Sequence, residues 1–172
     1  KGVAVGHQNL VNLVKGLSTT IYNSYKETLH ISLISPIFFD ASVKQIFPAL
    51  TIGHNLIVIP AAIRFDASEL VSYYIRRNIQ IADGTPFHAR IITQEGAGEV
   101  RKMDIKEFIL GGDELKFELV QQLFQIFNAN NLKISNVYGP TECTDVTTIH
   151  TITYENLWQE RKGLIGKPIP NY

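Results

Sequence analysis

The chain has 172 residues and a mass of 19.3 kDa, which suits one ordinary domain or a piece of a larger one. Its 16 lysines and arginines balance 16 aspartates and glutamates, so it lacks the basic excess with which proteins bind nucleic acid. Charged residues make up only 19%, below the roughly 25% typical of soluble domains. We therefore expect part of the surface to lie against a neighbour.

The chain also lacks the patterns of membrane and disulfide-rich proteins. No stretch approaches the roughly 18 uninterrupted apolar residues of a membrane span, because two serines and a proline interrupt the most apolar segment, His30 to Phe39. The one cysteine, Cys143, can form neither an internal disulfide nor a Cys-rich zinc site, which indicates a reducing compartment such as the cytoplasm. The chain begins at Lys1 without a signal-peptide pattern, so we expect an internal piece of a longer protein.

The first elements follow from apolar spacing and capping residues. Apolar residues at three- and four-residue steps predict an amphipathic helix from about His7 to Tyr22. The short run 30–35 contains β-branched residues and is a strand candidate. A short helix is expected over 43–50, where Asp40 can cap its start and Pro48 is expected to shorten or kink it.

The rest of the chain continues the same alternation. The nearly all-apolar run 55–59 is typical of a strand covered on both faces. Asp66 and Glu69 form an acidic version of the capping box, which opens a helix to about Asn78. Further strands and helices are expected in this order: a strand at 79–82, a helix from Pro86, a surface loop at 95–104, a strand at 106–110, a helix at 115–129, and strands at 133–137 and 146–153.

This alternation predicts an α/β fold with a mostly parallel sheet flanked by helices. In such sheets, ligands bind beyond the carboxyl ends of the strands. Function is therefore expected in the polar segments that follow successive strands, which are 39–42, 83–86, 111–114 and 138–142.

Taken singly, the residues of these segments leave alternatives open. Asp40 follows a strongly apolar run, so its carboxylate must cap a helix or meet a cation. The glycine pair 111–112 would let a ligand approach the backbone, or it simply makes a tight turn. Tyr138 offers a flat face to a base, Thr141 a hydroxyl to an anion and Glu142 an oxygen to Mg²⁺, although Tyr138 could be core and Glu142 merely solvated. The sequence contains no dinucleotide-binding or Walker motif and no metal-ligand spacing of histidines.

Four segments, in order along the chain, match one family pattern. Residues 1–12 look like the end of a phosphate loop and its following helix, 39–43 like a substrate-amine motif, 136–144 like an adenine and magnesium motif, and 165–169 like the entry to a further core motif. The chain thus resembles the adenylation domains of nonribosomal peptide synthetases, within the acyl-adenylate-forming superfamily. The resemblance implies that 1–172 is the central part of a single adenylation domain, within the large N-terminal core of an adenylate-forming enzyme. It also implies that the start of the phosphate loop and the C-terminal subdomain lie outside the chain.

The resemblance implies a reaction and its residues. An amino acid and ATP would give an aminoacyl-adenylate and pyrophosphate, and the acyl group would pass to the phosphopantetheine thiol of a carrier-protein domain, with other synthetase domains in cis. Asp40 would pair with the α-ammonium, Thr141 would contact the α-phosphate, and Glu142 would hold Mg²⁺, which makes Thr141 and Glu142 the catalytic positions. Tyr138 would stack on adenine and Asn136 would bind its amine. The implied nucleotide-binding positions are Gly112, Asp113, Glu114, Asn136, Tyr138, Gly139 and Thr141. The family has Gly-Gly-Glu-Ala at 111–114, where this chain has Gly-Gly-Asp-Glu, which adds an acidic group near the nucleotide.

The side-chain pocket is carried over from the same resemblance. Its positions are Asp40, Ala41, Lys44, Asp83, Ile109, Gly111, Val137, Asp145 and Val146. Apart from the last two, this set is similar to pockets for glutamate or glutamine, where Lys44 would meet the substrate carboxylate. Such pockets usually end in Val-Asp, whereas this chain has Asp145-Val146. If Asp145 points inward, the pocket is net negative and favours a basic or neutral polar side chain, so we expect glutamate or glutamine first and a basic amino acid second.

Two other functions compete with amino-acid activation. An aryl- or acyl-CoA ligase of the same superfamily has a substrate without an α-amino group, so Asp40 argues against it. A non-catalytic nucleotide-binding module is the second alternative. We expect that the 172 residues alone do not form an adenylate.

Overall fold

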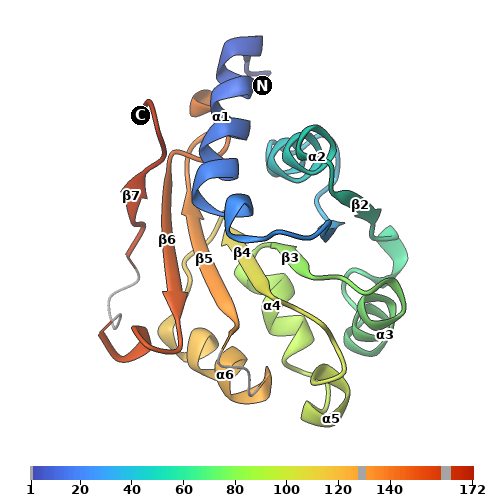
Figure 1. Ribbon diagram of the computed structural model, residues 1–172. Helices are drawn as coiled ribbons and strands as arrows, with labels where there is room; N and C mark the ends of the chain where they lie inside the picture. The colour runs from blue at the N-terminus through green and yellow to red at the C-terminus, as the bar shows by residue number, and fades with distance from the viewer. Residues whose placement is uncertain (1, 128–130, 160–163) are drawn as a thin grey trace.

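The computed structural model describes residues 2–127, 131–159 and 164–172. Within these ranges, a seven-stranded sheet forms the centre of the molecule, in the order β2-β1-β3-β4-β5-β6-β7 (Figure 1). The strands are β1 His30–Leu33, β2 Asn55–Val58, β3 Ile81–Gly84, β4 Glu107–Gly111, β5 Lys133–Tyr138, β6 Thr148–Thr153 and β7 Lys167–Pro168. Strands β1 to β5 pair in parallel, whereas β6 is antiparallel to β5 and β7 to β6. The predicted α/β class with a mostly parallel sheet is therefore confirmed.

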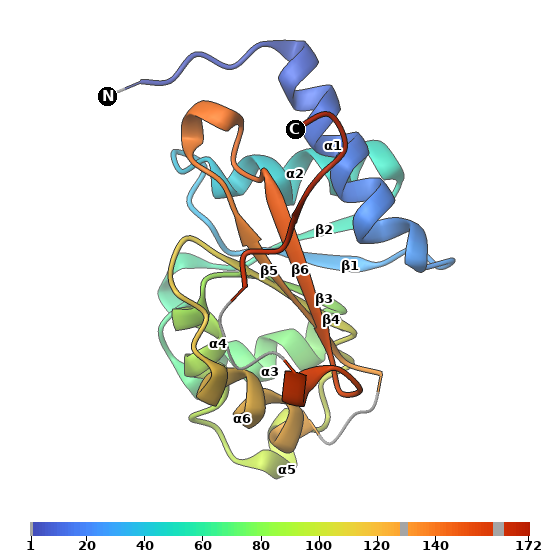
Figure 2. The ribbon, with the colours of Figure 1, turned by 90° about the vertical axis from the view of Figure 1, so that its left-hand side faces the viewer.

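Helices cover both faces of the sheet. They are α1 His7–Thr20, α2 Ala41–Ile52, α3 Ala67–Arg77, α4 Pro86–Ile92, α5 Ala97–Val100 and α6 Phe117–Phe127. Figure 2 shows α1 and α2 on one side of the sheet and α3 to α6 on the other. Each layer has its own buried apolar cluster, and β4 divides its side chains between them, because Phe108 and Leu110 join the α3–α6 cluster while Ile109 joins the α1–α2 cluster.

The predicted helix starts are mostly in place. Asp66 caps α3, where its Oδ1 accepts a hydrogen bond from the Glu69 backbone N–H at 2.9 Å. Asp40 caps α2, which begins two residues before the expected position 43. The helix runs through the buried Pro48 and ends four residues later, at Ile52, so the proline does not shorten it as expected.

Several sequence predictions were wrong in detail, among them the starts of β3, at Ile81 rather than 79, and of α6, at Phe117 rather than 115. The run 55–59 was expected to be covered on both faces, but β2 lies at the edge of the sheet and Val58 is 58% exposed. The expected loop 95–104 contains the short helix α5, and β6 begins at Thr148 rather than at 146. The expected end of the helix at 129 lies outside the described residues. Among the residues that are described, no helix is long and apolar enough to cross a membrane.

Candidate active site

The carboxyl ends of the parallel strands meet at one edge of the sheet, and a cavity of about 90 Å³ lies there. Its lining comes from segments far apart in the sequence: the start of α2, the ends of β3, β4 and β5, and the loop before β6. The lining residues are Asp40, Ala41, Lys44, Gly84, Thr85, Gly111, Gly112, Val137, Tyr138, Gly139, Asp145 and Val146. The four polar segments singled out in the sequence therefore contribute to one site, as the parallel topology requires.

A second and larger cavity, of about 450 Å³, adjoins the first. Tyr138 and Val137 line both cavities and so stand between them. The Tyr138 side chain is 53% exposed, which rules out the alternative that this tyrosine is a core residue. The larger cavity is lined by Gly112, Asp113, Glu114, Leu115, Asn136, Val137, Tyr138, Gly139 and Ile165. Six of the seven predicted nucleotide positions thus surround it, and the seventh is Thr141.

Asp40 takes the first of the two alternatives that the sequence left open, because it caps a helix. Its Oδ1 accepts a hydrogen bond from the Ala41 backbone N–H at 2.8 Å, which caps α2, and its Oδ2 accepts one from the Thr141 hydroxyl. Asp40 and Thr141 are 101 positions apart in the sequence. The helix cap therefore holds the Asp40 carboxylate at the wall of the small cavity, beside the predicted phosphate-contacting hydroxyl.

Behind this wall lies a buried ion pair. The ammonium of Lys44 contacts Oδ1 of Asp83 at 2.5 Å, and the side chains are 3% and 1% exposed. The amide of Gln45 donates to the same oxygen at 2.8 Å. Burial lowers the pKa of Lys44, but the charges of Asp83, Asp145 and Asp40 outweigh it and hold that pKa above its ordinary value. Lys44 therefore stays charged.

Asp145 lies in an unusual backbone segment. Thr144 and Asp145 both have left-handed backbone, with φ of 64° and 71°. The loop folds back so closely that a Cβ at Gly139 would lie 2.0 Å from the Asp145 carbonyl oxygen, which explains the glycine. Burial raises the pKa of the Asp145 carboxyl to about 6, opposed by Lys44 and reinforced by Asp83 and Asp40. Across the described part of the chain, Oδ2 of Asp145 is buried and has no hydrogen-bond partner.

Seven of the nine predicted pocket positions line the small cavity, and two do not. Asp83 lies behind Lys44, and Ile109 packs into the α1–α2 cluster at 1% exposure. A Cβ at Gly111 would lie 2.7 Å from the carbonyl oxygen of Val137, so this glycine keeps two strands close rather than merely leaving room for substrate. Gln45 was not among the predicted site residues, and its sequence signal is the polar Lys-Gln pair inside a mostly apolar helix.

The side chains around the larger cavity have local partners. Asn136 is 7% exposed, and its Nδ2 donates to the Leu164 carbonyl oxygen at 2.9 Å. Oδ1 of Asp113 accepts a hydrogen bond from the Glu114 backbone N–H at 2.7 Å. Glu142 is exposed, in the short helix Thr141–Cys143. No group of three or more His, Cys, Asp or Glu side chains that could hold a metal ion is found in the described ranges.

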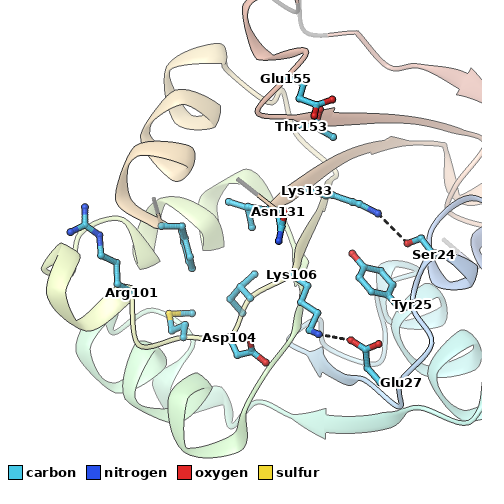
Figure 3. A pocket seen from close by; sticks show the side chains of 14 residues that line it. Ser24, Tyr25, Glu27, Arg101, Asp104, Lys106, Asn131, Lys133, Thr153 and Glu155 are labelled. Atoms are coloured by element: carbon cyan, nitrogen blue, oxygen red, sulfur yellow. Dashed lines mark hydrogen bonds and ion pairs between the residues drawn. The ribbon is translucent and has the colours of Figure 1, made fainter. Parts of the chain in front are cut away.

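A larger hollow, of about 720 Å³, lies at the opposite edge of the sheet (Figure 3). It surrounds the amino ends of β4 and β5, and its two lysines have partners. Lys106 pairs with Glu27, and the ammonium of Lys133 donates to the Ser24 hydroxyl at 3.1 Å. Because ligands of open α/β sheets bind at the carboxyl ends of the strands, we assign the site to the two smaller cavities.

A family described as AMP-binding enzyme matches residues 1–172. The chain is 40% identical over 171 residues to bacitracin synthase 1 of Bacillus licheniformis and 35% identical over 173 residues to surfactin synthase subunit 1 of Bacillus subtilis. Each match covers 99% of this chain but only 3% and 5% of those proteins. The AMPPNP-bound crystal structure of a nonribosomal peptide synthetase, FmoA3, has the same fold, with a TM-score of 0.84 at 22% identity over 99% of this chain and 18% of that one. The resemblance to adenylation domains is therefore confirmed, and the chain belongs to the family of AMP-binding enzymes.

Proposed function

We propose that this chain is part of a domain that activates an amino acid with ATP and then loads it onto a carrier protein. One observation carries the proposal: the small cavity beside Asp40 and the large cavity beside Asn136 share a wall that contains Val137 and Tyr138. An amino acid in the first cavity and a nucleotide in the second would meet at this wall. Such positioning turns an encounter of two reactants into a reaction within one complex.

The proposed chemistry has two steps. A carboxylate oxygen of the amino acid attacks the α-phosphorus of ATP, a new oxygen–phosphorus bond forms, and the bond to the oxygen that bridges to the β-phosphate breaks, so that pyrophosphate leaves. The phosphopantetheine thiol of the carrier protein then loses its proton and attacks the acyl carbon. AMP leaves and the thioester remains. The protein contributes mainly position and charge stabilisation.

Asp40 and Thr141 are proposed to hold the reacting ends. Each carboxylate oxygen of Asp40 accepts one hydrogen bond, from Ala41 and from Thr141. An ionised carboxylate offers about four acceptor sites, so capacity remains for a charge-assisted bond to the α-ammonium. The Thr141 hydroxyl, which donates to Asp40, would turn its proton to an α-phosphate oxygen when the nucleotide is bound.

The large cavity fits a nucleotide in size and lining. Its volume of about 450 Å³ lies within the range of roughly 300–1,000 Å³ for small-molecule sites. Tyr138 presents an exposed ring for stacking on adenine, and Gly112 leaves the backbone open to close approach. Asn136 would share its amide between the base and Leu164. Glu142 would supply a carboxylate to Mg²⁺, which commonly takes one or two carboxylates together with phosphate oxygens.

The partners and the substrate class are part of the proposal. The synthase and synthetase names of the relatives support a carrier-protein domain and neighbouring synthetase domains in cis. The lone Cys143 supports a cytoplasmic setting. A polar substrate side chain is supported by Lys44 and Asp145, which both line the small cavity.

The proposal is tested by ATP–pyrophosphate exchange in the protein that carries this chain, with each amino acid in turn. Asp40→Ala should lower the exchange by roughly 10- to 100-fold, the value of a hydrogen bond between charged groups. Glu99→Ala is the matched control, because it removes an exposed carboxylate of α5 whose side chain is 53% exposed. Exchange driven by aryl or fatty acids and unaffected by Asp40→Ala would instead favour the acyl-CoA ligase. We expect no exchange from the 172 residues alone.

A further inference from the structure

We infer that the small cavity selects an amino acid with a positively charged side chain, and that Asp145 is the residue that recognises this charge. The inference rests on the proposed amino-acid activation and names the substrate class for the same site. It reverses the order of substrates that the pocket residues predict by resemblance, which placed glutamate and glutamine first. The inference is argued from which charged groups in the cavity wall already have partners and which do not.

The positive charge of Lys44 is already engaged. Its ammonium lies 2.5 Å from Oδ1 of Asp83, and both side chains are almost wholly buried. A substrate carboxylate would have to draw Lys44 away from Asp83, which would keep only the amide of Gln45 at 2.8 Å. Removing the cation from a buried carboxylate is costly, because the remaining charge has neither water nor a counterion. Lys44 could therefore anchor glutamate only if this ion pair opened.

The negative charge of Asp145 is not engaged in the same way. This side chain lines the cavity, and within the described residues its buried Oδ2 has no hydrogen-bond partner. Lys44, Asp83 and Asp145 together carry one positive and two negative charges, so the wall has a net charge of −1 when all are ionised. A substrate ammonium would give Oδ2 the partner that it lacks and would neutralise the wall. A substrate carboxylate would add a further negative charge.

The loop holds the Asp145 carboxylate in place. The side chain of the next residue, Val146, is completely buried, and the backbone N–H of Val146 donates to the Thr144 carbonyl oxygen at 3.0 Å. On the other side, the Asp145 carbonyl oxygen packs where Gly139 has no side chain. These contacts hold the backbone on both sides of Asp145, which lowers the entropic cost of ordering this loop on binding.

Two carboxylates then face two ammonium groups. Asp40 at the mouth takes the α-ammonium, and Asp145 takes the one on the side chain. The cavity of about 90 Å³ has room for about six to nine water-sized volumes, which suits a short methylene stem with a terminal ammonium better than a bulky aromatic. Lysine and its shorter homologues, such as ornithine, belong to this class.

The selection should depend on pH. Burial raises the pKa of Asp145 to about 6, and the charged groups that act on it are Lys44, Asp83 and Asp40. Asp145 is therefore mostly ionised at pH 7.5 and mostly protonated at pH 5. We expect the preference for lysine or ornithine over norleucine, which has no side-chain charge, to fall as the pH drops through about 6.

The test is ATP–pyrophosphate exchange with lysine, ornithine, glutamine, glutamate and norleucine, in the protein that carries this chain. We expect kcat/KM for lysine or ornithine to exceed that for glutamine by at least about tenfold, and that for glutamate by more. Asp145→Asn keeps the shape and removes the charge, so it should lower kcat/KM for the basic substrates at least about tenfold while the value for glutamine stays the same or rises. Glu99→Gln, on the exposed surface of α5, is the matched control and should change neither value.

The outcomes separate the inference from the proposed function. Exchange that is strongest with glutamate, or a basic preference that Asp145→Asn leaves intact, would overturn the inference and leave amino-acid activation standing. Exchange with no amino acid at all would overturn both. A melting temperature of Asp145→Asn equal to or above that of the parent protein would show that a loss of basic substrates is not a loss of folding.

Discussion

The two ends of the central strands each bury a carboxylate, and they satisfy it in opposite ways. Asp83, towards the carboxyl end of β3, meets the cation of Lys44. Glu107, at the amino end of β4, accepts hydrogen bonds from two neutral hydroxyls, Tyr25 at 2.7 Å and Ser135 at 2.5 Å. The two carboxylates lie on adjacent strands. Asp83 pairs with Ile109, and Glu107 lies two residues before Ile109 on that strand. Similar burial thus leads to an ion pair beside the small cavity and, at the opposite edge, to hydrogen bonds from neutral hydroxyls.

The difference also shows which carboxylate oxygens lack a partner. Both oxygens of Glu107 have donors, in a network that borders the hollow of about 720 Å³ (Figure 3). At the carboxyl end, the described residues leave Oδ2 of Asp83 and Oδ2 of Asp145 without partners. Other buried polar atoms without a hydrogen-bond partner among the described residues, such as the Tyr22 hydroxyl and Nε2 of His54, lie away from the two smaller cavities.

The largest expected effect comes from breaking the ion pair. Lys44→Met fills a similar volume but leaves Asp83 charged and buried, so it should lower the free energy of unfolding by about 3–5 kcal/mol. Urea denaturation followed by circular dichroism measures this change. The double variant Lys44→Met with Asp83→Leu should recover most of the loss, because it removes both charges. A loss below about 1 kcal/mol in the single variant would mean that the pair is open to water.

Asp145→Asn should act in the opposite direction and stabilise the protein. The folded-state pKa of Asp145 is raised from 3.8 to about 6, so its stabilising contribution is present below pH 3.8 and is lost as the pH rises through 6. At pH 7.5 the asparagine variant should gain about 1–3 kcal/mol, since one pKa unit corresponds to about 1.4 kcal/mol and the group is partly exposed. The gain should shrink towards zero near pH 4. A constant gain across this range would contradict the assignment to the charge.

Tyr25→Phe probes the neutral network with a smaller change. It removes the hydroxyl that donates to Oε2 of Glu107 and keeps the ring, so we expect a loss of about 1–2 kcal/mol. Tyr73→Phe is a suitable control, because its hydroxyl donates to the backbone carbonyl of Val58 in an exposed position and should cost less. Equal losses from the two variants would remove the distinction between the buried network and an ordinary surface contact.

Glu107→Gln should change the free energy of unfolding least of all while the glutamate is protonated. The change should depend clearly on pH. Burial raises the pKa of Glu107, with Ser135 and Tyr25 opposing the shift. The glutamate's contribution is thus complete below its unfolded value of 4.5 and is lost as the pH rises towards the folded value. Below pH 4.5 the two proteins should differ by less than about 1 kcal/mol, since a protonated glutamate resembles glutamine. Above it, the variant should become the more stable of the two, and thermal unfolding at several pH values shows whether it does.

Local patterns were enough to predict the alternating elements and the edge of the sheet that carries the site. Asp66 and Glu69 lie three positions apart, and their cap is a local contact that the sequence displays directly. The ion pair of Lys44 and Asp83 joins residues 39 positions apart, and only the parallel pairing of the strands brings them together. No local sequence pattern could show that Asp83 would pair with Lys44 rather than contact a substrate.

The environment of a strand was harder to predict than its existence. The apolar run at β2 has the composition of a strand with both faces covered, yet β2 lies at the edge of the sheet. The antiparallel direction of β6 was also unpredicted, and it decides the site, because the reversal after Tyr138 brings the loop with Asp145 back over the ends of β4 and β5. Both features depend on neighbours in space rather than on residue patterns.

The left-handed backbone at Asp145 limits how this pocket could be redesigned. Aspartate tolerates a φ of 71°, but a β-branched valine at the same position would be a genuine outlier. Exchanging Asp145 and Val146 to give the usual Val-Asp order would therefore also require a new course for the loop around Gly139. The order of these two residues and the course of the loop are therefore coupled, so reversing the order should require replacement of the whole loop rather than two single substitutions.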